Sequence, residues 1–390
     1  MKILFLSPNN FFDVQGSTEP YYVYNYLCEN YQVELLTRKD KNASKNKGQF
    51  YSVPNLPLIP FLLTFNLMAL WLILRPKKED IDLIYCYKGV FLPVKVLRSL
   101  FDFAWIYDLR TAPVEQDRKF RKDQRKTWNW FESFKLDIEE TLYKNILTKQ
   151  DLILTLSEDL QKMLEAKYHL PSAKIHLLPL GVDLELFSPE KRVREDKLAP
   201  DLVKMVCVTS INKTRVMGLK VILDAMALLK GEEIHCKLTI VGRSSKDMIE
   251  GLKQYARERH LEEDLHLKGY VPHDEIPSLL EKYDIGLSPL PDIEAYRVAS
   301  PTKVFEYLAM KKIVIASDIT SHRKIIKDKY NGLLYNPNDP AAFTNTLVNL
   351  SRNPQLAKDL KSNSRTSIKD KSWNKILREL DQRLKLLFKD

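Results

Sequence analysis

Residues 300–306 combine a serine, a proline, a lysine and a glutamate at a spacing that could hold a phosphorylated ligand. Ser300 is favourable at the N-cap of a helix and Pro301 at its first position, so a helix is expected to begin here. The run IGLSPL before it has the pattern of a buried strand, which puts the helix start at the sheet edge where α/β proteins bind ligands. The free N–H groups and positive dipole of such a helix start suit a diphosphate.

Lys303 and Glu306 are three residues apart on this predicted helix and therefore share one face. Lys303 falls in the first turn, where its charge would add to the attraction for a diphosphate. Glu306 lies deeper, away from the phosphates, where a carboxylate can accept hydrogen bonds from ribose hydroxyls. The alternative is a well-capped helix that carries a Lys–Glu pair on its surface.

The elements that would position this helix follow a β/α alternation that occurs twice along the chain. In the first half, the predicted strands are Lys2–Ser7, Gln32–Thr37, Asp82–Cys86, Trp105–Leu109 and Leu152–Leu156, and the predicted helices are Glu19–Glu29, Lys126–Leu147 and Glu158–Lys167. In the second half, the predicted strands are Lys204–Ser210, Lys237–Val241, Leu265–Lys268, Ile285–Leu287 and Ile313–Ala316, and the predicted helices are Gly218–Leu229, Lys246–Glu258, Asp274–Lys282 and Thr302–Met310.

Two successive β/α halves predict an α/β protein with two Rossmann-like, doubly wound domains that face each other across a cleft. The length of 390 residues also favours two domains, because it exceeds what one core usually fills. We expect the first domain at 1–185, a linker at 186–200 and the second domain at 201–370. Residues 371–390 are expected to form an amphipathic helix that could cross back to the first domain.

The composition of the chain is compatible with several classes of ligand and does not choose among them. The formal charge of +10 is compatible with nucleic acid, anionic lipid or phosphorylated small molecules. The four cysteines have no metal-site or redox spacing, and three of them lie in apolar runs with the pattern of strands, which predicts buried thiols in a reducing compartment. The histidines also lack ligand spacing, so we expect His273 in a loop and His322 at the surface. The first residues, MKILFLSPNN, predict a strand rather than a signal peptide.

Two segments of the first half raise the question of a membrane. Val53–Leu74 has no charge over 22 residues, but its prolines leave about fifteen residues for a helix, fewer than a span needs. A membrane span, an interfacial anchor and a plain core helix are the alternatives. Asp117–Phe134 mixes cations with aromatic residues, which suits an anionic membrane surface, or else a solvated helix face over a core stripe. No recognised nucleic-acid module accompanies it, so nucleic acid is not expected as a partner.

Several segments resemble, in order, the motifs of glycosyltransferase family 4. SPTKVFEYLA at 300–309 is similar to the donor-site signature SP-x-K-x-x-EY-x-A of bacterial members. The other similar segments are DLILTLSEDL (151–160), LPLGVDLELFSP (178–189), LTIVGRSS (238–245) and LKGYVPHDEIPSLLEKYDIGLSPL (267–290). The resemblance covers nearly the whole chain. It implies a GT-B fold, a nucleoside-diphosphate-sugar donor, retention of anomeric configuration, and neither metal nor cofactor at the site.

The resemblance also implies the site residues. The donor-binding residues it implies are Gly16, Lys213, Arg215, Gly242, Val271, Ser300, Pro301, Thr302, Lys303 and Glu306. Lys303 is implied in catalysis with Asp108 and Arg110 of WIYDLRTAP, where Asp108 could orient an acceptor hydroxyl and Arg110 could meet the donor phosphate. A structural salt bridge is the alternative for that pair, and solvated loop cations are the alternative for Lys213 and Arg215.

Two positions depart from the family pattern. Val298 stands where the family often has a first glutamate, and Met217 stands where a lysine precedes Gly218. The expected function is transfer of a hexose-type sugar to a lipid-linked or polysaccharide acceptor, in the cytoplasm or on the inner face of the cell membrane. A sugar-nucleotide epimerase and an inactive donor-binding partner subunit are the alternatives. No G-x-G-x-x-G follows a first strand, which disfavours a nicotinamide dehydrogenase.

Overall fold

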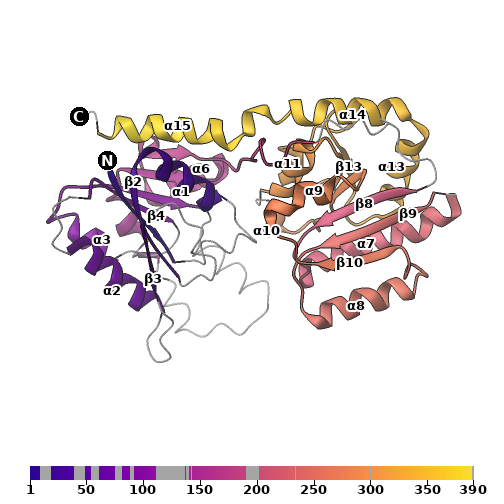
Figure 1. Cartoon of the computed structure of the whole chain (residues 1–390), viewed down its shortest axis with the longest axis horizontal. Coiled ribbons are helices and arrows are strands. Elements are labelled where there is room, and N and C mark those ends of the chain that lie inside the picture. The colour runs from indigo at the N-terminus through magenta and orange to yellow at the C-terminus, as the bar shows by residue number, and fades with distance from the viewer. Residues whose placement is uncertain are drawn as a thin grey trace. The chain divides into compact units, whose positions relative to one another are not determined.

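The chain forms two compact units, Met1–Pro179 with Ile376–Asp390, and Leu180–Lys375. The computed structural model describes residues 1–8, 19–38, 49–53, 61–74, 81–87, 92–110, 137, 140–141, 143–189, 202–232, 234–297 and 300–388. Gly16, Val298 and the basic aromatic segment Asp117–Phe134 lie outside these residues, as does most of the helix predicted over 126–147. Both units are built on parallel sheets covered by helices (Figure 1).

The N-terminal unit has a seven-stranded parallel sheet in the order β3-β2-β1-β4-β5-β6-β7. Its strands are β1 (Lys2–Ser7), β2 (Gln32–Arg38), β3 (Gln49–Val53), β4 (Leu83–Tyr87), β5 (Ala104–Leu109), β6 (Leu152–Thr155) and β7 (Ile175–Leu177). The order runs outward from β1 to β3 and then restarts on the other side at β4. This reversal is that of a doubly wound sheet.

Helices cover both faces of this sheet. The helices of the unit whose bounds lie in the described residues are α1 (Glu19–Asn30), α2 (Phe61–Leu74), α3 (Leu92–Leu97), α6 (Glu158–Tyr168) and most of α15 (Trp373–Leu386). On one face, Phe5 of β1 stacks on Tyr85 and meets the edge of Tyr24 from α1. On the other face, Phe65 and Leu72 of α2 join the core over β1 and β4. Every second side chain of a strand enters the same core, as the strand period requires.

The C-terminal unit has a six-stranded parallel sheet in the order β10-β9-β8-β11-β12-β13. Its strands are β8 (Val203–Val208), β9 (Cys236–Val241), β10 (Leu265–Gly269), β11 (Ile285–Ser288), β12 (Ile313–Ser317) and β13 (Leu333–Tyr335). Its helices are α7 (Lys213–Leu229), α8 (Lys246–Arg257), α9 (Ile276–Leu280), α10 (Glu294–Arg297), α11 (Thr302–Ala309), α12 (Thr320–Arg323), α13 (Pro340–Arg352) and α14 (Pro354–Thr366). Alternate residues of β8 divide between two cores, Met205 toward α7 and α13, and Val206 toward α9 and α11.

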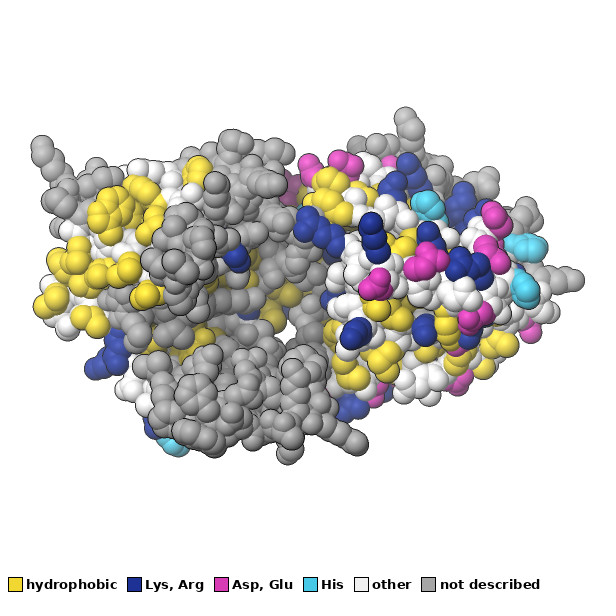
Figure 2. Space-filling model, turned by 90° about the horizontal axis from the view of Figure 1, so that it is seen from below, with side chains coloured by type: hydrophobic (Ala, Val, Ile, Leu, Met, Phe, Trp, Pro, Cys, Tyr) yellow, Lys and Arg dark blue, Asp and Glu magenta, His cyan; other side chains and the backbone are white. Residues whose placement is uncertain are grey.

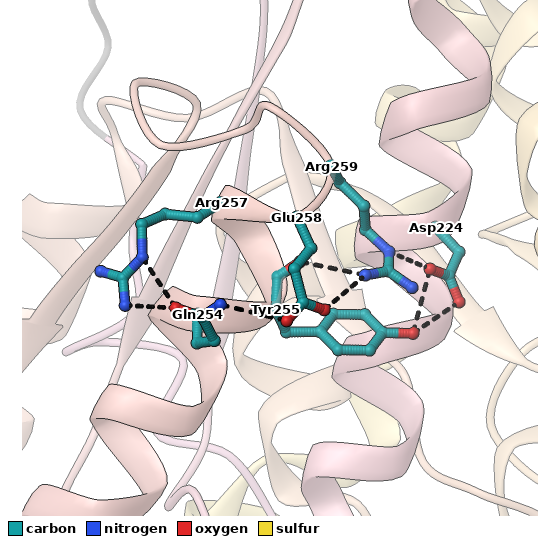
Figure 3. Close-up of polar contacts among 6 residues, drawn as sticks. All are labelled: Asp224, Gln254, Tyr255, Arg257, Glu258 and Arg259. Atoms are coloured by element: carbon teal, nitrogen blue, oxygen red, sulfur yellow. Dashed lines mark hydrogen bonds and ion pairs between the residues drawn. The ribbon is translucent and has the colours of Figure 1, made fainter.

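Two helices on one face of this sheet are joined by a polar cluster (Figure 3). Tyr255 of α8 donates its hydroxyl to Asp224 of α7, at 3.0 and 3.1 Å from the two carboxylate oxygens. The guanidinium of Arg259 also binds Asp224 and lies 3.4 Å from the centre of the Tyr255 ring. The cluster therefore fixes α7, whose first turn carries Lys213 and Arg215, against α8.

The predicted strands and helices that lie in the described residues are found within a few residues of their predicted bounds, except for the start of α7, and several further elements, among them helices α13 and α14, were not predicted. Strands β3, β7 and β13 were also not expected: all lie at sheet edges, β3 and β7 carry exposed or half-exposed residues that weaken the apolar signal, and β7 and β13 are only three residues long. Helix α7 begins five residues before the predicted Gly218, because the side chain of Asn212 caps it by accepting from the Arg215 N–H at 2.9 Å. Among the described residues, no helix combines the length and apolarity needed to cross a membrane.

Candidate functional site

The carboxyl edge of the second sheet gathers most of the predicted donor-binding residues. Lys213 and Arg215 follow β8, Gly242 follows β9, Val271 follows β10, and residues 300–306 follow β11. These four strands are adjacent and parallel, so their carboxyl ends share one edge. After β8 the chain adds β9 and β10 on one side of that strand, and it then adds β11, β12 and β13 on the other side. Ligands of doubly wound sheets bind at this reversal of the strand order, between β8 and β11.

Helix α11 starts at Thr302, as in the predicted range Thr302–Met310, but it is not capped as the sequence predicted. Pro301 occupies the N-cap position with ψ of 84°, and no side chain caps the helix. The predicted Ser300 cap is therefore wrong, because a tight backbone turn replaces it. In that turn the Thr302 N–H donates to the Ser300 carbonyl at 3.0 Å and the Val304 N–H to the Pro301 carbonyl at 3.0 Å. Thr302 and Lys303 begin the helix, which is eight residues long.

Tyr307 holds this helix against the sheet. Its buried ring lies over Gly286 of β11, where a Cβ would come within 2.4 Å of the ring. Its hydroxyl accepts a hydrogen bond from the Val208 N–H, at the carboxyl end of β8, at 2.8 Å. Helix α11 is thereby tied to both strands that flank the reversal.

Lys303 and Glu306 form the pair that the sequence predicted. The Lys303 ammonium is 2.8 and 2.9 Å from the two oxygens of Glu306, and the side chains are 29% and 5% exposed. Glu306 also contacts His273, whose Nε2 lies 3.2 Å from Oε1. Burial alone would raise the pKa of Glu306, but the charge of Lys303 and the hydrogen bond with His273 outweigh it and lower that pKa. Glu306 is thus a buried carboxylate, and the surface-pair alternative does not describe it.

Lys213 and Arg215 stand on the first turn of α7 and not on a loop. Lys213 is exposed, whereas Arg215 is partly buried and donates to the Ser210 hydroxyl at 2.5 Å. The guanidinium of Arg215 lies 6.0 Å from the centre of the Tyr296 ring. Arg215 is therefore held in place at the carboxyl edge of the sheet, while Lys213 matches the solvated alternative.

Gly242 allows two loops of this edge to touch. Its φ is +153°, and a Cβ there would lie 2.0 Å from the Thr209 carbonyl oxygen, so any side chain would push the loop after β9 away from the loop after β8. Its N–H donates to the Gly269 carbonyl at 2.7 Å. Val271 is half-buried and packs against the core that contains α11.

Asp108 and Arg110 form a buried ion pair at the end of β5 in the N-terminal unit. Arg110 Nε lies 2.5 Å from Asp108 Oδ1, and Nη2 lies 2.9 Å from Oδ2. The Tyr85 hydroxyl donates to Asp108 at 2.6 Å, and Arg110 donates to the Leu178 carbonyl at 2.8 Å. Burial and the Asp108 charge raise the pKa of Tyr85 well above its usual value. This geometry favours the structural salt bridge over the proposed contacts with substrate.

His322 is buried, so its predicted surface position is wrong. Its Nδ1 is 2.7 Å from the Ser317 carbonyl, which can only accept, so Nδ1 carries the proton and Nε2 accepts from the Ser288 hydroxyl at 2.8 Å. Burial lowers the pKa of His322 to about 4. The polar sequence around it, SDITSHRK, gave no sign of burial. His322 joins the carboxyl ends of β11 and β12, beside the predicted donor site.

Family models match both halves of the chain. The model for Glycosyltransferase Family 4 matches residues 21–186, and the model for glycosyl transferases group 1 matches residues 191–367. The amylovoran biosynthesis glycosyltransferase AmsK of Erwinia amylovora is 26% identical over 54% of this chain and 50% of that protein. The putative glycosyltransferase EpsD of Bacillus subtilis is 27% identical over 48% of this chain and 47% of that protein. The chain thus spans about half the length of these curated relatives.

Solved structures share the fold over the full length. A glycosyltransferase from Rickettsia africae has a TM-score of 0.75 at 17% identity, covering 100% of this chain and 99% of that one. Anabaena HepE in complex with UDP and glucose has a TM-score of 0.71 at 15% identity, covering 99% of each chain. The expected fold of two parallel-sheet α/β domains of the GT-B type is confirmed. Together with both family models, it supports a GT-B glycosyltransferase family for this chain.

Proposed function

We propose that this protein is a retaining, metal-independent glycosyltransferase that moves a hexose-type sugar from a nucleoside-diphosphate sugar to a lipid-linked or polysaccharide acceptor. The observation that carries the proposal is the start of α11, where Lys303 and Glu306 lie at the reversal of the second sheet. The first turn has no side-chain cap, and the positive end of the helix dipole together with the charge of Lys303 is suited to a diphosphate. The buried carboxylate of Glu306 is suited to the ribose hydroxyls.

The chemistry requires stabilisation of the charge that develops on the departing nucleoside diphosphate. An ammonium group has three N–H donors, and Lys303 directs two of its bonds to Glu306, so one donor is left for a phosphate oxygen. Arg215 on the neighbouring α7 would add a second positive charge. These groups are fixed before the donor binds, so little reorganisation is required when the charge develops.

The names of similar proteins support the substrate classes. HepE has been solved with UDP-glucose, and the curated relatives include enzymes named for amylovoran and colanic acid biosynthesis. These substrates belong to those proteins; for this chain a nucleotide sugar and a glycan or lipid-linked acceptor are proposed. The proposed location is the cytoplasm, with peripheral binding to the inner face of the cell membrane.

A thermal-shift panel of UDP-, GDP-, ADP- and TDP-sugars tests the donor. A ligand present at about 100 times its Kd should stabilise the folded chain by roughly 2.7 kcal/mol and raise its Tm. One nucleotide series should stand out from the others, because the base must be recognised. The absence of any shift across the panel would contradict the proposal.

Product analysis with the stabilising donor separates transfer from the two alternatives. Release of the nucleoside diphosphate that depends on an added acceptor supports a transferase. Conversion of the donor sugar without acceptor supports an epimerase, and binding without turnover supports an inactive subunit.

A further inference from the structure

Helix α2 exposes a row of large apolar side chains. Its fourteen residues, FLLTFNLMALWLIL, carry no charge. One side packs on the N-terminal sheet through residues such as Phe65 and Leu72. The exposed residues are Leu63, Leu67, Trp71 and Leu74, each between 49% and 56% exposed. Their spacing of four, four and three residues places them in one row along the helix.

Helix α3 and the residues after it extend this apolar surface. α3 packs against α2, and Val96, Leu100 and Phe101 are 62%, 71% and 46% exposed. In Figure 2, hydrophobic side chains gather on the left, over the part of the N-terminal unit where Figure 1 places α2 and α3. The apolar ridge consists of Leu63, Leu67, Trp71, Leu74, Val96, Leu100 and Phe101. Single exposed leucines are ordinary on soluble proteins, but a row along one helix that continues over neighbouring residues marks a contact surface.

We propose that the apolar ridge docks on a lipid bilayer, with α2 lying in the plane of the headgroups. Fourteen residues of helix measure about 21 Å, less than the ~30 Å of a hydrocarbon core, which suits a helix on the surface. Apart from the indole N–H of Trp71, the ridge side chains have no polar atoms, so the partner must be apolar where they meet it. Indole rings are enriched at the boundary between headgroups and acyl chains.

Charge favours an anionic bilayer as the occupant. The chain has a formal charge of +10, and Lys95 stands on α3 beside Val96 of the ridge. Each cation near an anionic leaflet adds to the attraction, and salt screens that contribution. The docking does not depend on the proposed transferase activity, since the ridge belongs to the N-terminal unit and the donor residues to the other. Loss of donor binding would therefore leave this proposal standing.

Sedimentation of the full chain with vesicles tests the ridge. The vesicles contain equal parts phosphatidylcholine and phosphatidylglycerol, and the variant is Leu67→Ser/Leu100→Ser. The matched control is Leu228→Ser/Leu386→Ser, which changes two leucines outside the ridge that are 50% and 55% exposed. We expect wild type and control to sediment, and the ridge variant to show a partition coefficient lower by at least about tenfold. Unchanged thermal midpoints show that both variants are folded.

Tryptophan fluorescence gives a second measurement. The emission of the wild type should shift to the blue on vesicles, and Trp71→Phe should remove the part of the shift that comes from the ridge. Three results would overturn the proposal: wild type that stays in the supernatant at low salt, a ridge variant that binds vesicles as wild type does, or a wild-type dimer that the ridge variant converts to monomer. The last result would identify a second copy of the chain as the occupant.

Discussion

The hydroxyl of Tyr307 accepts a hydrogen bond from the backbone N–H of Val208 at 2.8 Å, across the reversal of the second sheet. Tyr307 follows Glu306 on α11, and Val208 ends β8. Gly286 of β11 has no side chain, which leaves room for the Tyr307 ring to lie directly over that strand. The bond fixes the helix that carries Lys303 and Glu306 relative to the strand end that precedes α7. It gives the tyrosine that directly follows Glu306 a structural role in this chain.

Tyr307→Phe should lower the free energy of unfolding by about 0.5–1.5 kcal/mol, because the half-buried Val208 N–H loses its hydrogen-bond partner. Urea unfolding of wild type and variant measures the difference. Tyr330→Phe is the matched control, since Tyr330 is 41% exposed, and it should change stability by less than about 0.5 kcal/mol. Equal stability of the wild type and Tyr307→Phe would show that the hydrogen bond contributes nothing.

Glu306→Ala should weaken binding of the nucleoside diphosphate by about 1–3 kcal/mol, because ribose hydroxyls lose a buried charged acceptor. Calorimetric titration measures this with the nucleotide chosen by the thermal-shift panel and with its 2′,3′-dideoxy analogue. Wild type should discriminate against the analogue, and the variant should not. Glu250→Ala, on the exposed surface of α8, is the control and should bind as wild type does. Discrimination that survives in the variant would remove Glu306 from the ribose contact.

The sequence predicted the interior of each sheet well because those strands are continuously apolar. β1 was predicted with its observed bounds, and Lys303 and Glu306 were placed on one helix face because three residues of helix fix that geometry. Edge strands such as β13 were missed because three residues carry too little pattern. The hydrophobic periodicity of a segment was therefore sufficient to predict elements such as β1 and α11.

Contacts between distant segments could not be predicted in this way. His273 contacts Glu306 from 33 positions away, and His322 accepts a hydrogen bond from Ser288, 34 positions away. Periodicity along one segment contains no information about either pairing. The Asn212 cap was missed for a different reason: asparagine favours the N-cap of a helix but also favours turns, so its presence alone does not fix a helix start.

Lys303→Ala should lower kcat about a hundredfold while the KM for the donor changes by less than about threefold. The reason is that its charge matters most when the diphosphate leaves, so its stabilisation is larger in the transition state than in the ground state. Steady-state kinetics with saturating acceptor measure both constants. Lys303→Arg should retain part of the activity, and Lys358→Ala, an exposed lysine on α14, should retain all of it. Wild-type rates in Lys303→Ala would leave the lysine as a structural partner of Glu306 only.

His322 should make the fold sensitive to acid. Burial lowers the pKa of His322 to about 4 in the folded chain, whereas an unfolded histidine titrates near 6.5. Between these values the unfolded state binds the proton more strongly, so the stabilisation is complete above about pH 6.5 and is lost as the pH falls toward 4. From pH 7.5 to pH 5 the loss should be about 2 kcal/mol, measured by urea unfolding.

The variant His322→Gln should be less stable than wild type at pH 7.5 but should lose about 2 kcal/mol less on going to pH 5, because its amide does not titrate there. His176, whose pKa is also lowered chiefly by burial, is present in both proteins, so its contribution cancels in the comparison. His266→Gln replaces an exposed histidine and should keep the wild-type dependence on pH. If His322→Gln and wild type lose the same stability in acid, the buried imidazole is not the group responsible.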